Sequence, residues 1–364
     1  MPNLRVHDAV NGGRAAIASI RDPRIIELAN QHSTFRSFIA RFKDAFGVAV
    51  EPSILIVKKS KSKPLKLEPL ASFRDLVALS VIPYQRAQMI VRRGQIPRIL
   101  YSNTFYLYPW MLDKNYQHLM TSTISGMGLH MASKFYGQSS PDIFAHDLQQ
   151  HDIDETLFKV LLQRWEHRYF KPKPSHTDIA LFRSLNMATV ACQTPGVVDT
   201  TMYDIGRIVA LWVSAFEILA HPGPGQKVDI TTIYELFDNI SYQDTTLSKK
   251  IYKARTPRLR KHTKGNLPQF VYGQLYEARN AFLHGNEVSH ATLRPKNSKS
   301  LLFHLAPPLY RLALTSVLQI NRPPPMPPAS DAKAFAKYIV DNMDYYEGQQ
   351  IVERAILRAR RSRN

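Results

Sequence analysis

The sequence is nearly free of cysteine. Cys192 is the one cysteine among 364 residues, so an internal disulfide and a zinc site built from several thiolates are both excluded. The residues before Cys192 are mostly apolar, and we expect this side chain to be a small buried hydrophobe rather than a nucleophile. The sequence also lacks His-Glu-x-x-His, Walker-type and Gly-x-Ser-x-Gly motifs. We therefore expect neither a metal nor a cofactor.

Long apolar runs are missing as well. The longest, residues 208–220, covers about 13 residues and contains Ser214 and Glu217, whereas a bilayer span needs about 20. The first residues contain no apolar stretch of the kind found in signal peptides. We expect no contact with a membrane and a cytoplasmic location.

Acidic residues are scarce relative to basic ones. Lysine and arginine number 48 against 29 aspartates and glutamates, for a formal net charge of +19. Such an excess favours a nucleic-acid partner, because neutralising phosphates releases counterions. The alternative is that the charge only keeps the protein in solution.

The spacing of apolar residues predicts a mainly α fold. Helices are expected at 153–169, 179–192, 203–220, 232–239, 269–284 and 308–320. Residues 1–152 mix weaker signals, including short strands at 48–50 and 54–57, and form an expected α/β domain of unknown role. Residues 153–325 form the expected helical bundle. Residues 326–364 combine the end of a proline linker with a tethered, arginine-rich basic helix.

The predicted helix at 269–284 carries the residues with chemical potential. One stripe is apolar and must face the core, comprising Val271, Leu275, Ala278 and Phe282. Arg279 lies at the edge of that stripe, Asn280 and His284 share the outward face, and Gly285 is a natural helix stop. Arg279 and His284 are about 140° apart around an ideal helix. Either the chain turns at 283–285, or a second copy of the chain completes the site; we favour a dimer.

Arg279, four intervening residues and His284, with Asn280 after the arginine and Gly285 after the histidine, resemble the signature of the HEPN superfamily. The preceding helix with Ser214–Leu219, the breaker-rich link and the final helix are similar to its Apea-like branch. The resemblance covers residues 153–325 and rests on a short motif.

The resemblance implies a metal-independent endoribonuclease that acts as a homodimer. The ribose 2′-OH would attack the adjacent phosphate, with His284 as general base or acid. Arg279 would bind the phosphate, Asn280 would orient the substrate or the imidazole, and Glu217 would hold Arg279. Relatives of this branch occur in toxin and phage-defence systems, which adds an antitoxin or an activating protein to the expected partners. The basic stretch 249–264 would bind RNA through Arg255, Arg258, Arg260 and Lys261.

Two alternatives remain open at this point. Arg279 could be an ordinary edge residue and His284 a helix end favoured by the dipole, in a catalytically inactive RNA-binding or dimerisation module. The chain could instead be a DNA-binding regulator that uses its basic tail helix.

Overall fold

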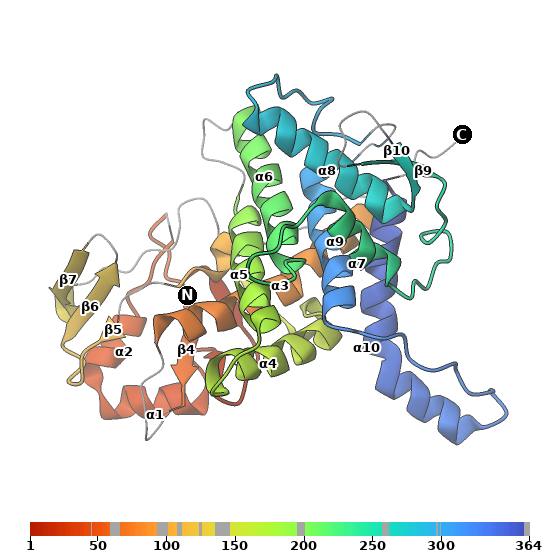
Figure 1. Cartoon of the computed structure of the whole chain (residues 1–364). Helices are drawn as coiled ribbons and strands as arrows, with labels where there is room; N and C mark the ends of the chain where they lie inside the picture. The colour runs from red at the N-terminus through yellow and green to blue at the C-terminus, as the bar shows by residue number, and fades with distance from the viewer. Residues whose placement is uncertain are drawn as a thin grey trace. The chain divides into compact units, whose positions relative to one another are not determined.

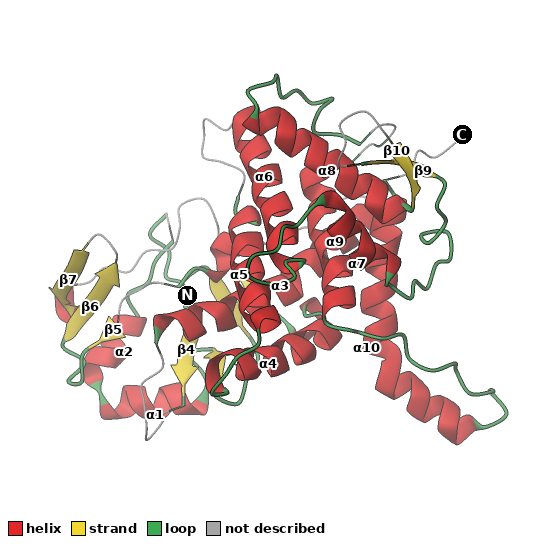
Figure 2. Cartoon of the chain, viewed as in Figure 1, coloured by secondary structure: helices red, strands yellow, loops and turns green. Residues whose placement is uncertain are grey.

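The computed structural model describes the whole chain except residues 45, 59–65, 93–100, 108–110, 124–125, 135–145, 195–200, 257–261, 296–297, 299 and 360–364. The described part contains ten α-helices and mostly short strands (Figure 2), so the expected mainly α fold class is confirmed. The chain forms two compact units, one made of residues 1–74 and 100–152 and the other of residues 75–99 and 153–364.

The first unit combines two short helices with small sheets. Strand β4 (Ile54–Val57) pairs antiparallel with β3 (Ala15–Ala18), which pairs with β2 (Val10–Asn11). The strand expected at 54–57 is therefore confirmed, whereas at 48–50 the described chain shows only an isolated bridge at Ala49. The remaining elements are β1 (Leu4–Val6), α1 (Pro23–Gln31), α2 (Ser33–Ile39), β5 (Met111–Leu112), β6 (His118–Thr123), β7 (Gly126–Met131) and β8 (His146–Leu148).

Helix α3 (Leu67–Val91) is the main element that the sequence pattern did not predict. Its residues 75–83 are buried without interruption, so its apolar positions form no stripe with helical period. Pro83 inside the helix is a second misleading signal, because proline usually ends a helix. From residue 75 onward α3 belongs to the second unit, which places this part of the expected 1–152 domain with the bundle.

The second unit is a helical bundle built around α6 (Met202–Leu219), which packs against three other helices. Besides α3 from residue 75 onward, its helices are α4 (Glu155–Phe170), α5 (His176–Ala191), α6, α7 (Ile230–Asp238), α8 (Leu267–Leu283), α9 (Leu302–Val317) and α10 (Ala332–Leu357) (Figure 1). All six helices expected in this region are present. Helix α9 begins at Leu302 rather than at 308. Proline is commonest in the first turn of a helix, but Pro307 and Pro308 lie inside α9, so they did not mark its start.

Aromatic side chains fix the helices around the centre of the bundle. The ring of Phe216 on α6 lies 5.1 Å from Tyr272 of α8, 5.4 Å from Tyr310 of α9 and 6.2 Å from Phe237 of α7, between ring centroids. Tilted and edge-to-face pairs of this kind add stability beyond the area that they bury. Helix α8, which carries the candidate site, is thus held on its inner side by a packed core.

The carboxyl-terminal helix is not a separate body. The second half of α10 buries Val352, Ala355 and Ile356 completely, and α10 packs on α9 and α4. The expected tethered helix therefore belongs to the bundle. Of its expected basic residues, Arg354 and Arg358 are described, and the arginines after 359 lie outside the described residues. Within the described chain, no helix is both long and apolar enough to cross a membrane.

Candidate functional site

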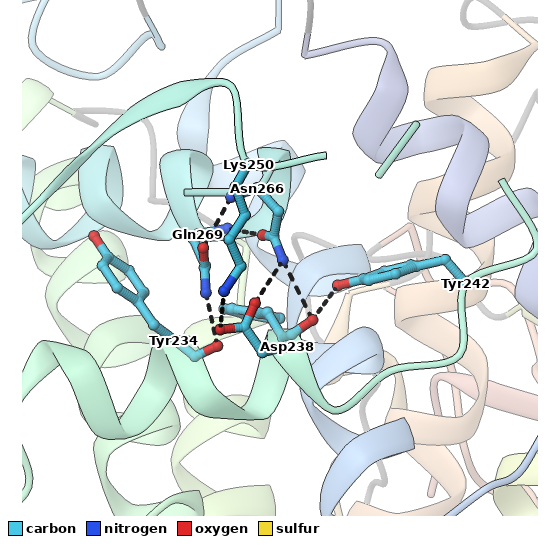
Figure 3. Close-up of polar contacts among 7 residues, drawn as sticks. Tyr234, Asp238, Tyr242, Lys250, Asn266 and Gln269 are labelled. Atoms are coloured by element: carbon cyan, nitrogen blue, oxygen red, sulfur yellow. Dashed lines mark hydrogen bonds and ion pairs between the residues drawn. The ribbon is translucent and has the colours of Figure 1, made fainter. Parts of the chain in front are cut away.

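A polar network fixes the start of α8 (Figure 3). The Asn266 side chain accepts a hydrogen bond from the Gln269 backbone N–H, and the Gln269 side chain accepts one from the Asn266 N–H, which is a capping box. The same two side chains donate to α7, from Asn266 Nδ2 to the Phe237 carbonyl and from Gln269 Nε2 to the Tyr234 carbonyl. The network therefore caps α8 and ties it to α7.

The apolar stripe predicted for α8 faces the core. Val271, Leu275 and Ala278 are buried, and Phe282 is half-buried. Phe282 packs against Gly206 of α6, where an added Cβ atom would lie 2.6 Å from the ring. The absence of a side chain at Gly206 therefore lets α6 and α8 approach closely at the end of α8 that carries the motif.

Arg279 and Glu217 meet across this approach of α6 and α8. Arg279 Nη2 lies 3.8 Å from Glu217 Oε2, and Arg279 Nη1 donates to Asn280 Oδ1 at 3.1 Å. The Nε atom of Arg279 is buried without a hydrogen-bond partner. The guanidinium group thus contacts two neighbours, while its Nε–H is buried without an acceptor.

The surroundings of Glu217 act on its charge in two directions. Burial raises the pKa of the Glu217 carboxyl group, and the positive charge of Arg279 lowers it. The Tyr272 hydroxyl is buried without a hydrogen-bond partner, and burial together with the nearby Glu217 carboxylate raises its pKa well above 10. At neutral pH Tyr272 is therefore a neutral neighbour of the Arg279–Glu217 pair.

His284 lies at the end of α8 and is exposed. Gly285 follows with a positive φ of 71°. The Asn286 N–H bonds to the Ala281 carbonyl at 2.9 Å and the Gly285 N–H to the Phe282 carbonyl at 3.4 Å, which together form a Schellman motif. Gly285 ends the helix as the sequence indicates. Among the described residues, no hydrogen bond or ion pair joins His284 to Arg279.

A hairpin beside α8 brings a second arginine to the site. Strands β9 (Tyr252–Arg255) and β10 (His262–Gly265) pair antiparallel, and β9 packs on α8. Arg255 Nη1 lies 3.3 Å from Glu277 Oε1. The guanidinium groups of Arg255 and Arg279 each lie 5.7 Å from the ring centroid of Tyr276. Arg258, Arg260 and Lys261 lie outside the described residues.

Tyr276 was not predicted as part of the site. Its position three residues before Arg279 is a usable signal, since side chains at this spacing are neighbours on a helix. The proximity of Arg255 carried no such signal, because it depends on how the hairpin packs on α8. Both arginines interact with the tyrosine ring through its negative face.

No described group of three or more His, Cys, Asp or Glu side chains is placed to hold a metal ion. Cys192 is buried, and burial raises the pKa of its thiol to about 12, so the thiolate needed for nucleophilic chemistry is absent at neutral pH. Comparisons of the chain with protein-family models, with curated proteins and with solved structures found no match. The resemblance to the HEPN superfamily expected from the sequence therefore rests on the motif residues alone.

Proposed function

We propose that the second unit is a metal-independent endoribonuclease of the HEPN type. The observation that carries this proposal is the arginine of the motif, oriented by Glu217 and Asn280, on the same helix end as an exposed histidine. Arginine binds phosphate oxygens through planar N–H pairs, and imidazole titrates near neutral pH. These are the two groups that phosphodiester transfer without a metal needs.

In the proposed reaction the ribose 2′-OH attacks the adjacent phosphorus and loses its proton to an imidazole. The bond from phosphorus to the 5′ oxygen breaks, and that oxygen takes up a proton. The products are a 2′,3′-cyclic phosphate and a free 5′-OH. Arg279 stabilises the negative charge that grows on the phosphate. His284 is the group that accepts or donates the proton, and Asn280 holds the guanidinium.

Because positions 279 and 284 are about 140° apart around an ideal helix, we propose that a homodimer completes each site. Arg279 of one copy and His284 of another would then act on the same phosphate. Arg255 would bind a neighbouring phosphate of the RNA, since its guanidinium group and that of Arg279 each lie 5.7 Å from the Tyr276 ring centroid.

Cleavage of RNA in EDTA tests the proposal. The parent protein should leave 2′,3′-cyclic phosphate ends, and His284→Ala should lose about 100-fold or more in rate, the scale of a general acid or base. His290→Ala is the matched control, because His290 is also exposed and follows the motif closely. Equal cleavage by the parent and His284→Ala would contradict the proposed role of His284. No cleavage by either protein, with RNA binding intact, would leave an RNA-binding or dimerisation module.

A mixing experiment tests the shared site separately. Arg279→Ala and His284→Ala chains are each expected to be inactive. Mixed in equal amounts, they should recover part of the parent activity, because a mixed dimer retains one intact site. If mixed dimers form but no activity returns, each chain must use its own Arg279 and His284, and the shared site would be wrong.

A further inference from the structure

Helix α10 exposes one side of its first half. Figure 1 shows this half reaching away from the other helices of its unit. Tyr338 and Tyr345 are buried, and the Tyr338 hydroxyl donates to the Pro324 carbonyl in the proline linker. At about 100° per residue, the position of Val340 is opposite to these tyrosines. Val340 is 79% exposed, the highest value among the large apolar side chains that the structure describes as exposed.

Val340 is the centre of a row of exposed side chains along α10. The row is Lys333, Lys337, Val340, Asp344 and Glu347, with spacings of four, three, four and three residues. This spacing keeps all five within roughly 80° of the helix circumference. We call the row the outer stripe. It has two positive charges before Val340 and two negative charges after it.

The outer stripe is complementary to itself. If a second α10 helix lies antiparallel with the two Val340 side chains in contact, Lys333 faces Glu347 of the other copy, and Lys337 faces Asp344. A two-fold axis through Val340 repeats both pairs, giving four ion pairs around an apolar centre. Such isologous contacts are how cyclic dimers form, and charges at flanking positions set the orientation of paired helices.

We propose that the outer stripe is a dimerisation surface, and that its partner is the same stripe of a second copy of this chain in antiparallel orientation. RNA fits the surface poorly, because the stripe carries no net charge although the whole chain carries +19. The opposite signs at its two ends distinguish it from an ordinary basic face. The stripe shares no residue with the end of α8 at which a second copy is proposed to complete the site, and the inference does not depend on ribonuclease activity.

One contact within the chain bears on the strength of this interface. Asp344 Oδ2 lies 3.7 Å from Lys159 Nζ of α4, which also bonds Glu155 at 3.0 Å. In the dimer, Asp344 would then lie between Lys159 of its own chain and Lys337 of the second copy. Exposed ion pairs contribute little each and are screened by salt, so the expected dimer is weak and weakens further as ionic strength rises.

Charge reversal tests the proposal in the full-length protein. Sedimentation equilibrium at low ionic strength should show a monomer–dimer equilibrium for the parent. Lys333→Glu/Lys337→Glu makes the stripe wholly acidic, and Asp344→Lys/Glu347→Lys makes it wholly basic. Each double variant alone should therefore lose the self-association that the outer stripe provides. The two variants mixed in equal amounts should form a heterodimer. The chain with all four changes should dimerise as the parent does.

Crosslinking at Val340 tests the register. Cys192 is buried, so a bis-maleimide should join two Val340→Cys chains and leave two Asp341→Cys chains largely unjoined, since residue 341 is exposed but points about 100° away. Circular dichroism of each variant shows that it is folded. A parent that is monomeric at all concentrations would overturn the proposal, as would charge-reversed variants that associate as strongly as the parent.

Discussion

At the scale of single residues, the Glu217 carboxyl group makes the candidate site sensitive to pH. Its pKa is raised above the ordinary value of 4.5, because burial outweighs the attraction of Arg279. The folded state therefore binds this proton more tightly than the unfolded state does. The resulting stability is fully present below about pH 4.5 and is lost as the pH rises through the raised pKa.

Glu217→Gln should remove this pH dependence. As the pH rises from about 4 to about 7, the parent should lose unfolding free energy relative to the Glu217→Gln variant, because only the parent has a carboxyl group that loses its proton there. Urea unfolding across that range measures it, with Glu235→Gln, an exposed carboxylate on α7, as the control. If the difference in unfolding free energy did not change with pH, the Glu217 carboxyl group would bind its proton equally tightly in the folded and the unfolded chain.

Gly285 is a second residue whose replacement has a calculable effect. Its φ of 71° is the left-handed conformation, which costs a residue with a Cβ atom about 1–2 kcal/mol. Gly285→Ala should therefore lower the unfolding free energy by about 1 kcal/mol, and Gly285→Asn by less, because asparagine tolerates this conformation better. Equal stability of the alanine variant and the parent would mean that the helix end readily adopts another turn.

At the scale of elements, the contact of Gly206 with Phe282 sets the distance between α6 and α8. Glycine inside a helix costs about 1 kcal/mol relative to alanine, so propensity alone predicts that Gly206→Ala is stabilising. The Cβ atom would, however, lie 2.6 Å from the Phe282 ring, and overpacking costs about 1–3 kcal/mol. We expect a net loss of up to about 2 kcal/mol in urea unfolding.

Phe282→Leu provides the matched test of that contact. Combined with Gly206→Ala, the smaller side chain should relieve the clash, so the double variant should be more stable than the sum of the single changes predicts. If the single change Gly206→Ala stabilised the protein, the Phe282 ring would have moved aside at no cost.

Helix α6, which the sequence predicted, has an apolar face with a more polar face opposite. Its observed bounds lie within one residue of the expected 203–220. Helix α3 is buried over 75–83 and has no such contrast, so periodicity could not reveal it. Within the site, the contact of Arg279 with Glu217 was expected only from the family resemblance, and the contact of Tyr276 with Arg255 needed the packing of other elements.

At the scale of the whole bundle, a buried polar chain links elements that are distant in sequence. Arg311 of α9 donates from Nε to Asp154 Oδ2 at 2.6 Å, and both side chains are 1% exposed. Asp154 caps α4 through the Leu157 N–H and donates its own N–H to the Ser80 carbonyl of α3. On the α10 side, Glu353 accepts bonds from the backbone of Gln243 and Asp244. These contacts join four helices and the loop after α7.

Breaking the Asp154–Arg311 pair should therefore destabilise the bundle as a whole. Arg311→Met leaves the Asp154 carboxylate buried without its charged partner, and removal of one member of such a pair costs about 3–5 kcal/mol. Adding Asp154→Asn removes the stranded charge and keeps an oxygen to cap α4, so the double variant should regain about 1–2 kcal/mol over Arg311→Met. Urea unfolding followed by circular dichroism measures both. If the double variant were no more stable than Arg311→Met, the loss would come from packing around the arginine stem rather than from the unpaired charge.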